Sequence, residues 1–317
     1  HNTQLPTLHA ITLQAITLHA IMDNNLVKTG SCSIVVGPNH YMTYKPIKPF
    51  KLLKITKVDH TNDEFKTLTP IRTIENYSRY YSIPDEVNYL LQPGNRFYTY
   101  IKTLVPIDES YFMNGTLHCC YMDYAGNKEL LETINDIESK YDFSIWNSYK
   151  TILKFSKHIL DGLSFLHKKK ICHLDIKPEN IIVNTYKKTY KIIDFGFSSE
   201  EPFDDFVKHT RGTPGYFPKY FETEKPTPWL PKVDANDMIY DNNILFHIDR
   251  RLVYKIDSYC LGRVLYMLRY IYNDNRIYMC FNTEKKNKKK LNEIIDSLVE
   301  NDANKRMTIN QCLEEYF

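Results

Sequence analysis

The chain has 317 residues and a formal net charge of +3; 25% of its residues are charged and 43% are hydrophobic. These values are typical of a globular protein, and no uncharged apolar run approaches the roughly 18 residues that a membrane span needs. The seven cysteines are scattered without a C-x-x-C pair, which argues against a disulfide framework or zinc site and favours a reducing, intracellular compartment, with the cytoplasm preferred.

Residues 1–25 form an N-terminal extension that repeats five residues three times, as TLHAI, TLQAI and TLHAI. The apolar positions alternate steps of three and two, which fits neither the helical nor the strand period, so no structure is assigned to them. We expect a poorly ordered or loosely packed extension. The chain starts at His1 and could therefore be a fragment or a processed product.

The remaining chain divides at a short central stretch. Residues 26–122 alternate apolar and polar positions in short runs, which predicts a sheet with few helices. Residues 123–128 are the expected hinge, and residues 129–317 have helical periods. One predicted helix ends near His167 and carries an apolar stripe made of Ile152, Phe155, Ile159, Leu163 and Leu166. The pattern predicts a small sheet lobe joined to a larger helical lobe.

Four polar residues follow that helix at a spacing that suggests chemistry. Asp175, Lys177 and Asn180 lie within six positions, and Asp194 comes after a predicted hairpin. Aspartate and asparagine oxygens are suitable Mg²⁺ ligands, and a lysine can neutralise a transferring phosphoryl group. Each residue alone is more often a turn or surface residue. Together they favour a phosphoryl-transfer site.

These stretches, HLDIKPEN and IIDFG, resemble the catalytic loop and metal-binding loop of eukaryotic-type serine/threonine protein kinases. Further resemblances follow in order along the chain: ILDGLSFLHKKKI, RGTPGYF, KIDSYCLG and ENDANKRMTINQCLEEYF. The resemblance implies an α+β, bilobal protein kinase fold. Its N-lobe is a small antiparallel sheet with one main helix, and its larger C-lobe is mostly helical. Within the C-lobe, 194–222 would be the activation segment and 223–254 an insertion.

The resemblance also implies roles for individual residues. Asp175 would orient the attacking hydroxyl and accept its proton, and Lys177 would steady the γ-phosphate of ATP. Asn180 and Asp194 would hold Mg²⁺, for which Mn²⁺ is an alternative. Asp257 would be the buried aspartate that holds the catalytic loop; the simpler interpretation is a helix-capping aspartate.

The expected nucleotide site in the sheet lobe is more divergent. KTGSCSIV aligns with the family's Gly-rich loop but keeps only Gly30 and Val35, which predicts a weaker grip on ATP. The remaining expected nucleotide contacts are Ile182, which with Val35 would sandwich the adenine, Met122 as gatekeeper, Asp123 and Tyr124 as the hinge pair, and Glu129 as the ribose-binding acid.

The phosphate-binding lysine has to be chosen from Lys51, Lys54 and Lys57. Lys54 is preferred because an apolar residue two positions earlier lies on the same face of the strand, as the family pattern requires. For its helical partner we prefer Glu86 over Glu75, since EVNYLL follows a proline that suits a first helical turn. The long spacing between Lys54 and Glu86 implies an insertion.

Substrate class is predicted from Lys177-Pro178 and Gly212-Thr213, which resemble the serine/threonine type. The expected partners are proteins with a serine or threonine acceptor. The lysine clusters at 168–170 and 285–290 are interpreted as solvated surface in preference to a patch for acidic partners or nucleic acid. The oligomeric state is not predicted.

Two departures from the family pattern matter for regulation and docking. Pro218-Lys219-Tyr220 replaces A-P-E, so the usual partner of Arg306 is missing, with Glu222 or Glu224 as possible substitutes. Leu174 replaces the arginine that usually receives a phosphate of the activation segment, and the segment itself is acidic. Activity is therefore predicted not to depend on phosphorylation there.

Other functions remain open at this stage. An ATP-binding pseudokinase or scaffold would explain the eroded Gly-rich loop, and an aminoglycoside-type phosphotransferase shares part of the catalytic motif. A P-loop enzyme is excluded because its phosphate-binding motif is absent. The composition and the divergence would suit a kinase of a large DNA virus, acting in the host cytoplasm or the virion.

Overall fold

The computed structural model describes residues 27–29, 33–38, 51–57, 67–85, 89–92, 94–104, 117–203, 213, 215–218, 250–275 and 284–317. Their contacts divide the chain into two units. The smaller unit holds the residues up to Phe65 together with Ser82–Asn127, and the larger unit holds Lys66–Tyr81 together with Lys128–Phe317.

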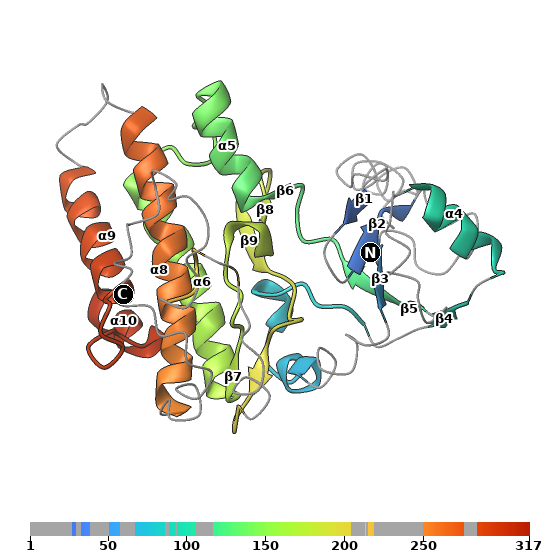
Figure 1. Ribbon diagram of the computed structural model, residues 1–317. Helices are drawn as coiled ribbons and strands as arrows, with labels where there is room; N and C mark the ends of the chain where they lie inside the picture. Colours follow the sequence, from blue (N-terminus) through green and yellow to red (C-terminus); the bar gives the residue numbers. More distant parts are fainter. Residues whose placement is uncertain are drawn as a thin grey trace, which may run out of the picture. The chain divides into compact units, whose positions relative to one another are not determined.

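The smaller unit contains a five-stranded antiparallel sheet in the order β1-β2-β3-β5-β4. Its strands are β1 (Val27–Thr29), β2 (Ser33–Val36), β3 (Lys51–Lys57), β4 (Tyr89–Leu91) and β5 (Leu117–Asp123). Helix α4 (Arg96–Leu104) belongs to the same unit (Figure 1). The short alternating runs of the sequence therefore do form an antiparallel sheet.

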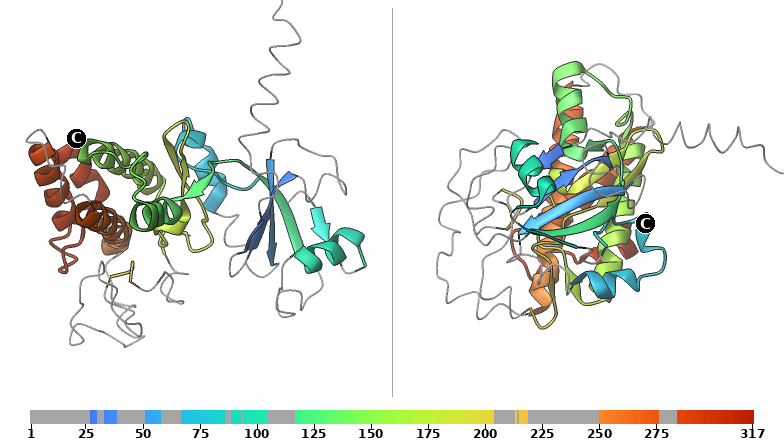
Figure 2. Two further views of the ribbon diagram at one scale, coloured as in Figure 1. Left: turned by 90° about the horizontal axis from the view of Figure 1, so that it is seen from above. Right: turned by 90° about the vertical axis from the view of Figure 1, so that its right-hand side faces the viewer.

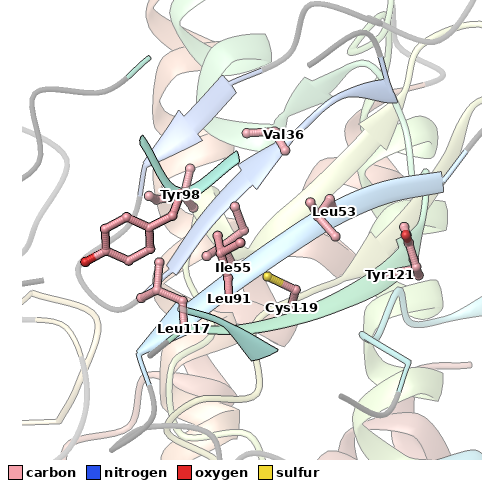
Figure 3. Close-up of a cluster of buried hydrophobic side chains, with 9 residues drawn as sticks. Val36, Leu53, Ile55, Leu91, Tyr98, Leu117, Cys119 and Tyr121 are labelled. Carbon is pink, nitrogen blue, oxygen red and sulfur yellow. The ribbon is translucent and has the colours of Figure 1, made fainter. Parts of the chain in front are cut away.

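An apolar cluster covers one face of this sheet (Figure 3). Strand pairing places Ile34 opposite Ile55, and Leu53 opposite Tyr121, so β-branched and aromatic side chains meet across neighbouring strands. Tyr98 of α4 is part of the cluster, which joins the helix to the sheet. Because side chains alternate along a strand, this packing leaves Leu52 and Lys54 on the opposite face.

The larger unit is mostly helical. Its principal helices are α5 (Leu130–Lys140), α6 (Tyr149–Lys168), α8 (Arg250–Asn275), α9 (Lys285–Leu298) and α10 (Ile309–Tyr316). Its short strands and 3-10 turns are η1 (Tyr77–Arg79), β6 (Lys128–Glu129), β7 (Ile171–Cys172), η3 (Pro178–Asn180), β8 (Ile181–Asn184), β9 (Thr189–Ile192) and β10 (Ser199–Glu200). The presence of an antiparallel-sheet unit and a mostly helical unit confirms the predicted α+β fold class.

Helices α6, α8, α9 and α10 pack side by side and form the core of the larger unit (Figures 1 and 2). The predicted apolar stripe of α6 is buried, and the helix ends one residue after His167. Ser148 caps its first turn by accepting a hydrogen bond from the Thr151 backbone. Gly262 lets α8 approach α9 closely, because a Cβ there would lie 2.7 Å from a methyl group of Val299.

Residues 66–81 lie with the larger unit, although the sequence had placed all of 26–122 in the sheet lobe. Tyr80 packs against His158 and Phe165 of α6, with ring centroids 5.0 and 5.2 Å away. The Tyr81 hydroxyl donates to the Gly162 carbonyl, and Tyr81 forms a parallel bridge with Ile192. Two adjacent tyrosines thus attach this segment to α6 and β9. Tyrosine-rich composition gave no sign of it.

Candidate active site

The loop between β7 and η3 is held in place by Asp257 of α8. The Asp257 carboxylate is fully buried and accepts hydrogen bonds from the backbone N–H groups of His173 and Leu174, each at 2.8 Å. The His167 ring lies 2.9 Å from the same carboxylate. Burial alone would raise the pKa of Asp257, but these hydrogen bonds and neighbouring histidines outweigh it and lower the pKa. Asp257 therefore holds the loop as an ionised group, and the helix-capping interpretation is wrong because Asp257 lies inside α8 (Arg250–Asn275).

The Asp175 carboxylate lies at the centre of a compact polar cluster. Lys177 Nζ lies 3.0 Å from Asp175 Oδ2, and Asn180 Nδ2 donates to the same oxygen at 2.9 Å. Thr213 donates its hydroxyl to Asp175 Oδ1 at 2.5 Å and accepts from Lys177 Nζ at 2.8 Å. All three donors converge on one carboxylate, in a residue that is only 5% exposed. Its position and orientation are thus fixed before any substrate arrives.

Asn180 and Asp194 have the chemistry of magnesium ligands. Asn180 uses its amide nitrogen to donate to the Asp175 carbonyl and carboxylate, which directs the amide oxygen elsewhere. The Ile193 N–H donates to the Asn180 carbonyl at 2.9 Å, so the residue before Asp194 is bonded to Asn180. Asp194 is exposed and adopts a left-handed conformation with φ 61°. A carboxylate and an amide oxygen on adjoining loops suit a hard divalent cation.

Phe195 anchors the loop that carries Asp194. Its ring is fully buried and lies 4.9 Å from the His173 ring and 5.9 Å from the Tyr81 ring, centroid to centroid. The His173 ring in turn lies 3.1 Å from the Ile193 carbonyl. The same histidine therefore contacts residues on both sides of Asp194, while its backbone is bound to Asp257. This arrangement joins the two loops of the site through apolar and polar contacts.

Glu129 and Ile182, both expected to contact the nucleotide, are paired residues of β6 and β8. Ile182 is half-buried. Glu129 is the N-cap of α5 and forms a capping box with Glu132, whose carboxylate accepts from the Glu129 N–H at 3.0 Å. Glu129 therefore stabilises the start of α5, and its role as a ribose-binding acid stays a prediction.

In the smaller unit, Lys54 lies in the centre of the sheet. It pairs with Val35 of β2 and Cys120 of β5, while Leu52 pairs with Met122. Because these residues share one face, the predicted lysine, gatekeeper and adenine-contacting valine all lie on the side opposite the apolar cluster of Figure 3. Lys54 is 5% exposed and Met122 7%.

Lys51, the rejected alternative, has different neighbours. Its ammonium lies 3.3 Å from Asp85 and 3.2 Å from Asp123 at the end of β5. Asp123 is exposed and Tyr124 half-buried, and the Asp123 carbonyl accepts from the Ser82 hydroxyl at 2.5 Å. Lys51 is thus held by carboxylates at the strand end. Strand register favours Lys54 over Lys51.

The helix predicted for EVNYLL around Glu86 is wrong, because Tyr89–Leu91 of that stretch form strand β4. Pro84 forms an antiparallel bridge with Met122, and the Asp85 N–H donates to the Tyr121 carbonyl, so the chain entering this region is extended. Glu86 itself lies outside the described residues, as does Gly30 of the Gly-rich loop. Glu75, the alternative, is an exposed turn residue of the larger unit. Proline at a helix start and at a sheet edge look alike in a single sequence.

A family model described as the protein kinase domain matches residues 101–317. The chain belongs to the protein kinase domain family. Serine/threonine-protein kinase nekl-2 of Caenorhabditis elegans is 32% identical over 137 residues, which cover 43% of this chain and 36% of that protein. Myosin light chain kinase 2 (skeletal/cardiac muscle) of Rattus norvegicus is 32% identical over 149 residues, or 47% of this chain and 19% of the relative.

A probable serine/threonine-protein kinase of Dictyostelium discoideum is 34% identical over 108 residues, covering 30% of this chain and 15% of the relative. The matched stretches thus span about a third or less of the length of these relatives. The family match begins at residue 101, so β1 to β4 of this kinase domain lie before it. The departures from the Gly-rich loop pattern fall in that same part.

Two residues of the kinase site were not predicted as site residues. Thr213 was used only to assign substrate class, yet its hydroxyl contacts both Asp175 and Lys177. Arg263 of α8 is 2% exposed and contacts the backbone near Thr213. A detectable signal did exist for Arg263, because it is the one charged residue within the run SYCLGRVLYML.

Among the described residues, Arg306 is bonded to backbone carbonyls. Its guanidinium donates to three backbone carbonyls, those of Glu300, Lys255 and Asn301, and it lies over the Tyr259 ring. These hydrogen bonds connect the turn before α10 to the start of α8. The two glutamates predicted as substitutes lie outside the described residues. In the part of the kinase domain that the structure describes, no helix is long and apolar enough to cross a membrane.

Proposed function

We propose that the chain is a protein kinase that transfers the γ-phosphate of ATP to serine and threonine hydroxyls of protein substrates. The main observation in support is that three side chains together orient the Asp175 carboxylate, namely Lys177, Asn180 and Thr213. In such a position Asp175 would accept the hydrogen bond and then the proton of the acceptor hydroxyl. Lys177 would stay beside it as a cation that stabilises the transferring phosphoryl group.

Asn180 and Asp194 would hold Mg²⁺, with Mn²⁺ as an alternative, and the ion would offset the negative charge of the phosphates. Lys54 would bind the α- and β-phosphates. Val35, Ile182 and Met122 would surround the adenine. Membership in the kinase family, two relatives named as serine/threonine kinases, and the contact of Lys177 with a threonine support the serine/threonine class.

Activity is proposed not to require phosphorylation of the segment after Asp194. Leu174 is fully buried with φ 65°, so no cation is present at the position that usually receives the phosphate. Ser198 and Ser199 are 3% and 5% exposed, and the Ser198 hydroxyl donates to the His173 carbonyl at 3.3 Å. Strand β10 already pairs with β7. The start of the segment is thus ordered, and its serines are shielded, without a phosphate.

The test is a transfer assay with labelled ATP, Mg²⁺ and a mixture of generic protein substrates. We expect label on serine and threonine after acid hydrolysis, at least about a hundredfold lower in Asp194→Asn. Asp161→Asn is the matched control, because Asp161 forms a surface pair with Lys157 away from the site. Binding of ATP without transfer by the unmodified protein would refute the proposal and favour a scaffold.

A further inference from the structure

Arg263 is a buried cation in the central helix of the larger unit. Only 2% of the residue is exposed, and burial lowers the pKa of its guanidinium. Removing an arginine from water is unfavourable unless its donors are matched by acceptors. An apolar side chain of similar size would fit the run SYCLGRVLYML at lower cost. The charge therefore needs a reason beyond packing.

The partners of Arg263 lie on the loop at the end of the predicted activation segment and on its own helix. Its Nε donates to the Gly215 carbonyl at 3.1 Å, and its guanidinium lies 5.8 Å from the centroid of the Tyr259 ring. Within the described residues, its Nη1 has no hydrogen-bond partner. Gly215 has φ +84°, a left-handed conformation that favours glycine, so the carbonyl that Arg263 holds belongs to a tight turn.

That turn is closed by bonds of its own. The N–H groups of Tyr216 and Phe217 donate to the Thr213 carbonyl at 3.2 and 3.3 Å. The Tyr216 hydroxyl donates to Met267 Sδ at 3.4 Å. Arg263 and Met267 are four residues apart on α8 and lie on the same face of the helix. The helix thus holds the turn at two points, a backbone carbonyl and a side chain.

Thr213, at the start of the turn, carries the hydroxyl that contacts Asp175 and Lys177. A shift of the turn would therefore move a hydroxyl that is bonded to both. We infer that Arg263 is a positioning residue: by holding Gly215 it keeps Thr213 against the Asp175 carboxylate and Lys177. This inference rests on the proposed function and extends it to a residue that touches no reactant.

Arg306 supplies the contrast that supports this role. Both guanidiniums lie over the ring of Tyr259, at 4.8 Å for Arg306 and 5.8 Å for Arg263. Arg306 donates to three carbonyls that join α8 to the turn before α10, all remote in sequence from Thr213. Arg263 instead holds a carbonyl next to the catalytic cluster. Arg306 therefore connects two parts of the helical unit, whereas Arg263 supports the turn that carries Thr213.

Because position 174 holds a leucine and no arginine, the activation segment needs another means of support. Many kinases of this type hold the activation segment through a phosphate bound by that arginine. With a buried leucine there, the end of the segment needs another anchor. Arg263 provides one from α8, and the anchor does not depend on phosphorylation.

The experiment compares Arg263→Met with Arg263→Gln and Arg263→Lys in the full chain. Arg263→Met keeps the volume and removes every donor, so we expect kcat to fall at least about tenfold, because small displacements of catalytic groups are costly. KM for ATP should change less than about twofold, since the nucleotide contacts are untouched. A donor at the same place should restore part of kcat in Arg263→Gln or Arg263→Lys. A residue with only a packing role would give no such rescue.

Hydrogen exchange supplies a readout independent of activity. In Arg263→Met the amides of Tyr216 and Phe217 should exchange at least about tenfold faster, while the amides of α6 keep their rates. Arg269→Met is the matched control, since Arg269 also lies on α8, over the ring of Tyr266, and donates to Asn292. It should leave both kcat and the exchange at 216–217 unchanged.

The outcomes separate the two proposals. Unchanged kcat and unchanged exchange in Arg263→Met would overturn the role of Arg263 while leaving the proposed function intact. If the unmodified chain transfers no phosphate, the proposed function fails, and the exchange measurement still decides whether Arg263 holds the turn. Faster exchange throughout the larger unit of Arg263→Met would show a general structural role and would also overturn the inference.

Discussion

The loop around Asp175 and the sheet around Lys54 position their functional groups in different ways. Asp175 is oriented by three side chains, and its loop is bound through the backbone to the buried Asp257. Lys54 is positioned by strand register, between Val35 and Cys120. A hydrogen-bonded loop demands particular residues at particular spacings. A strand requires only that the functional side chain lies on the face of the sheet opposite the apolar cluster.

This difference explains how closely each region follows the family. The match to the kinase family begins at residue 101 and so contains the Asp175 loop but not Lys54. A sheet tolerates exchange of one apolar side chain for another, provided that the alternation is kept. The loop around Asp175 has no comparable freedom, because each substitution would leave a buried partner unsatisfied.

In the sheet, the largest effect is expected for Lys54→Met. If register alone selects the functional lysine, this variant should lower turnover by about a hundredfold, since a cation at the phosphates would be lost. Lys51→Met is the control on the same strand, and it loses the ion pairs with Asp85 and Asp123. Its turnover should stay within about threefold of the unmodified protein. Equal losses in steady-state turnover for the two variants would contradict the assignment by register.

The next effect concerns the stability of the Asp175 loop. Asp257→Asn weakens bonds to His167, His173 and Leu174 and should lower the free energy of unfolding by about 3 kcal/mol, as measured by urea denaturation. Asp161→Asn, at a surface pair, should cost less than about 1 kcal/mol. A loss of similar size in both variants would show that the loop does not depend on a buried anion.

The same carboxylate gives the unmodified protein a pH dependence. The pKa of Asp257 is lowered in the folded state, so its stabilisation is complete above the unfolded value of about 3.9 and is lost as pH falls through the folded value. The free energy of unfolding should therefore decline more steeply below about pH 4 in the unmodified protein than in Asp257→Asn. Parallel curves across this acidic range would remove Asp257 as the cause.

The smallest effect is expected at the segment that follows Asp194. Replacing Ser198, Ser199 and Thr210 together by alanine should change turnover by less than about threefold, because Leu174 offers no cation to a phosphate. Ser198 loses one hydrogen bond, to His173, which accounts for a minor loss of stability. A loss of turnover of about a hundredfold would mean that phosphorylation of this segment is required after all.

Much of the larger unit could be predicted from sequence because its signals are local. The apolar stripe of α6, the spacing from Asp175 to Asn180 and the position of Asp194 depend on short stretches of chain. The antiparallel sheet was equally visible in its alternation. Lys54 was chosen by the same reasoning, and the register of β3 supports the choice.

Contacts between distant segments could not be predicted in this way. Tyr80 and Tyr81 attach residues 66–81 to α6, and the extended chain at Pro84 replaces the first turn of the helix expected around Glu86. Arg263 meets Gly215 across 48 positions of sequence. Each of these depends on which surfaces meet in three dimensions, and a single sequence records only the residue types that make such meetings possible.

If Asp175 serves phosphoryl transfer to serine and threonine, replacing its carboxylate by an amide should slow the reaction without loosening ATP. The initial rate of phosphate transfer from ATP to protein substrate is compared between the unmodified chain and Asp175→Asn, with ATP binding measured on both. We expect the Asp175→Asn substitution to lower the rate by about a thousandfold while ATP binding changes little, because an amide cannot accept the proton of the hydroxyl. Equal rates in the two proteins, or no transfer by either, would contradict the claim.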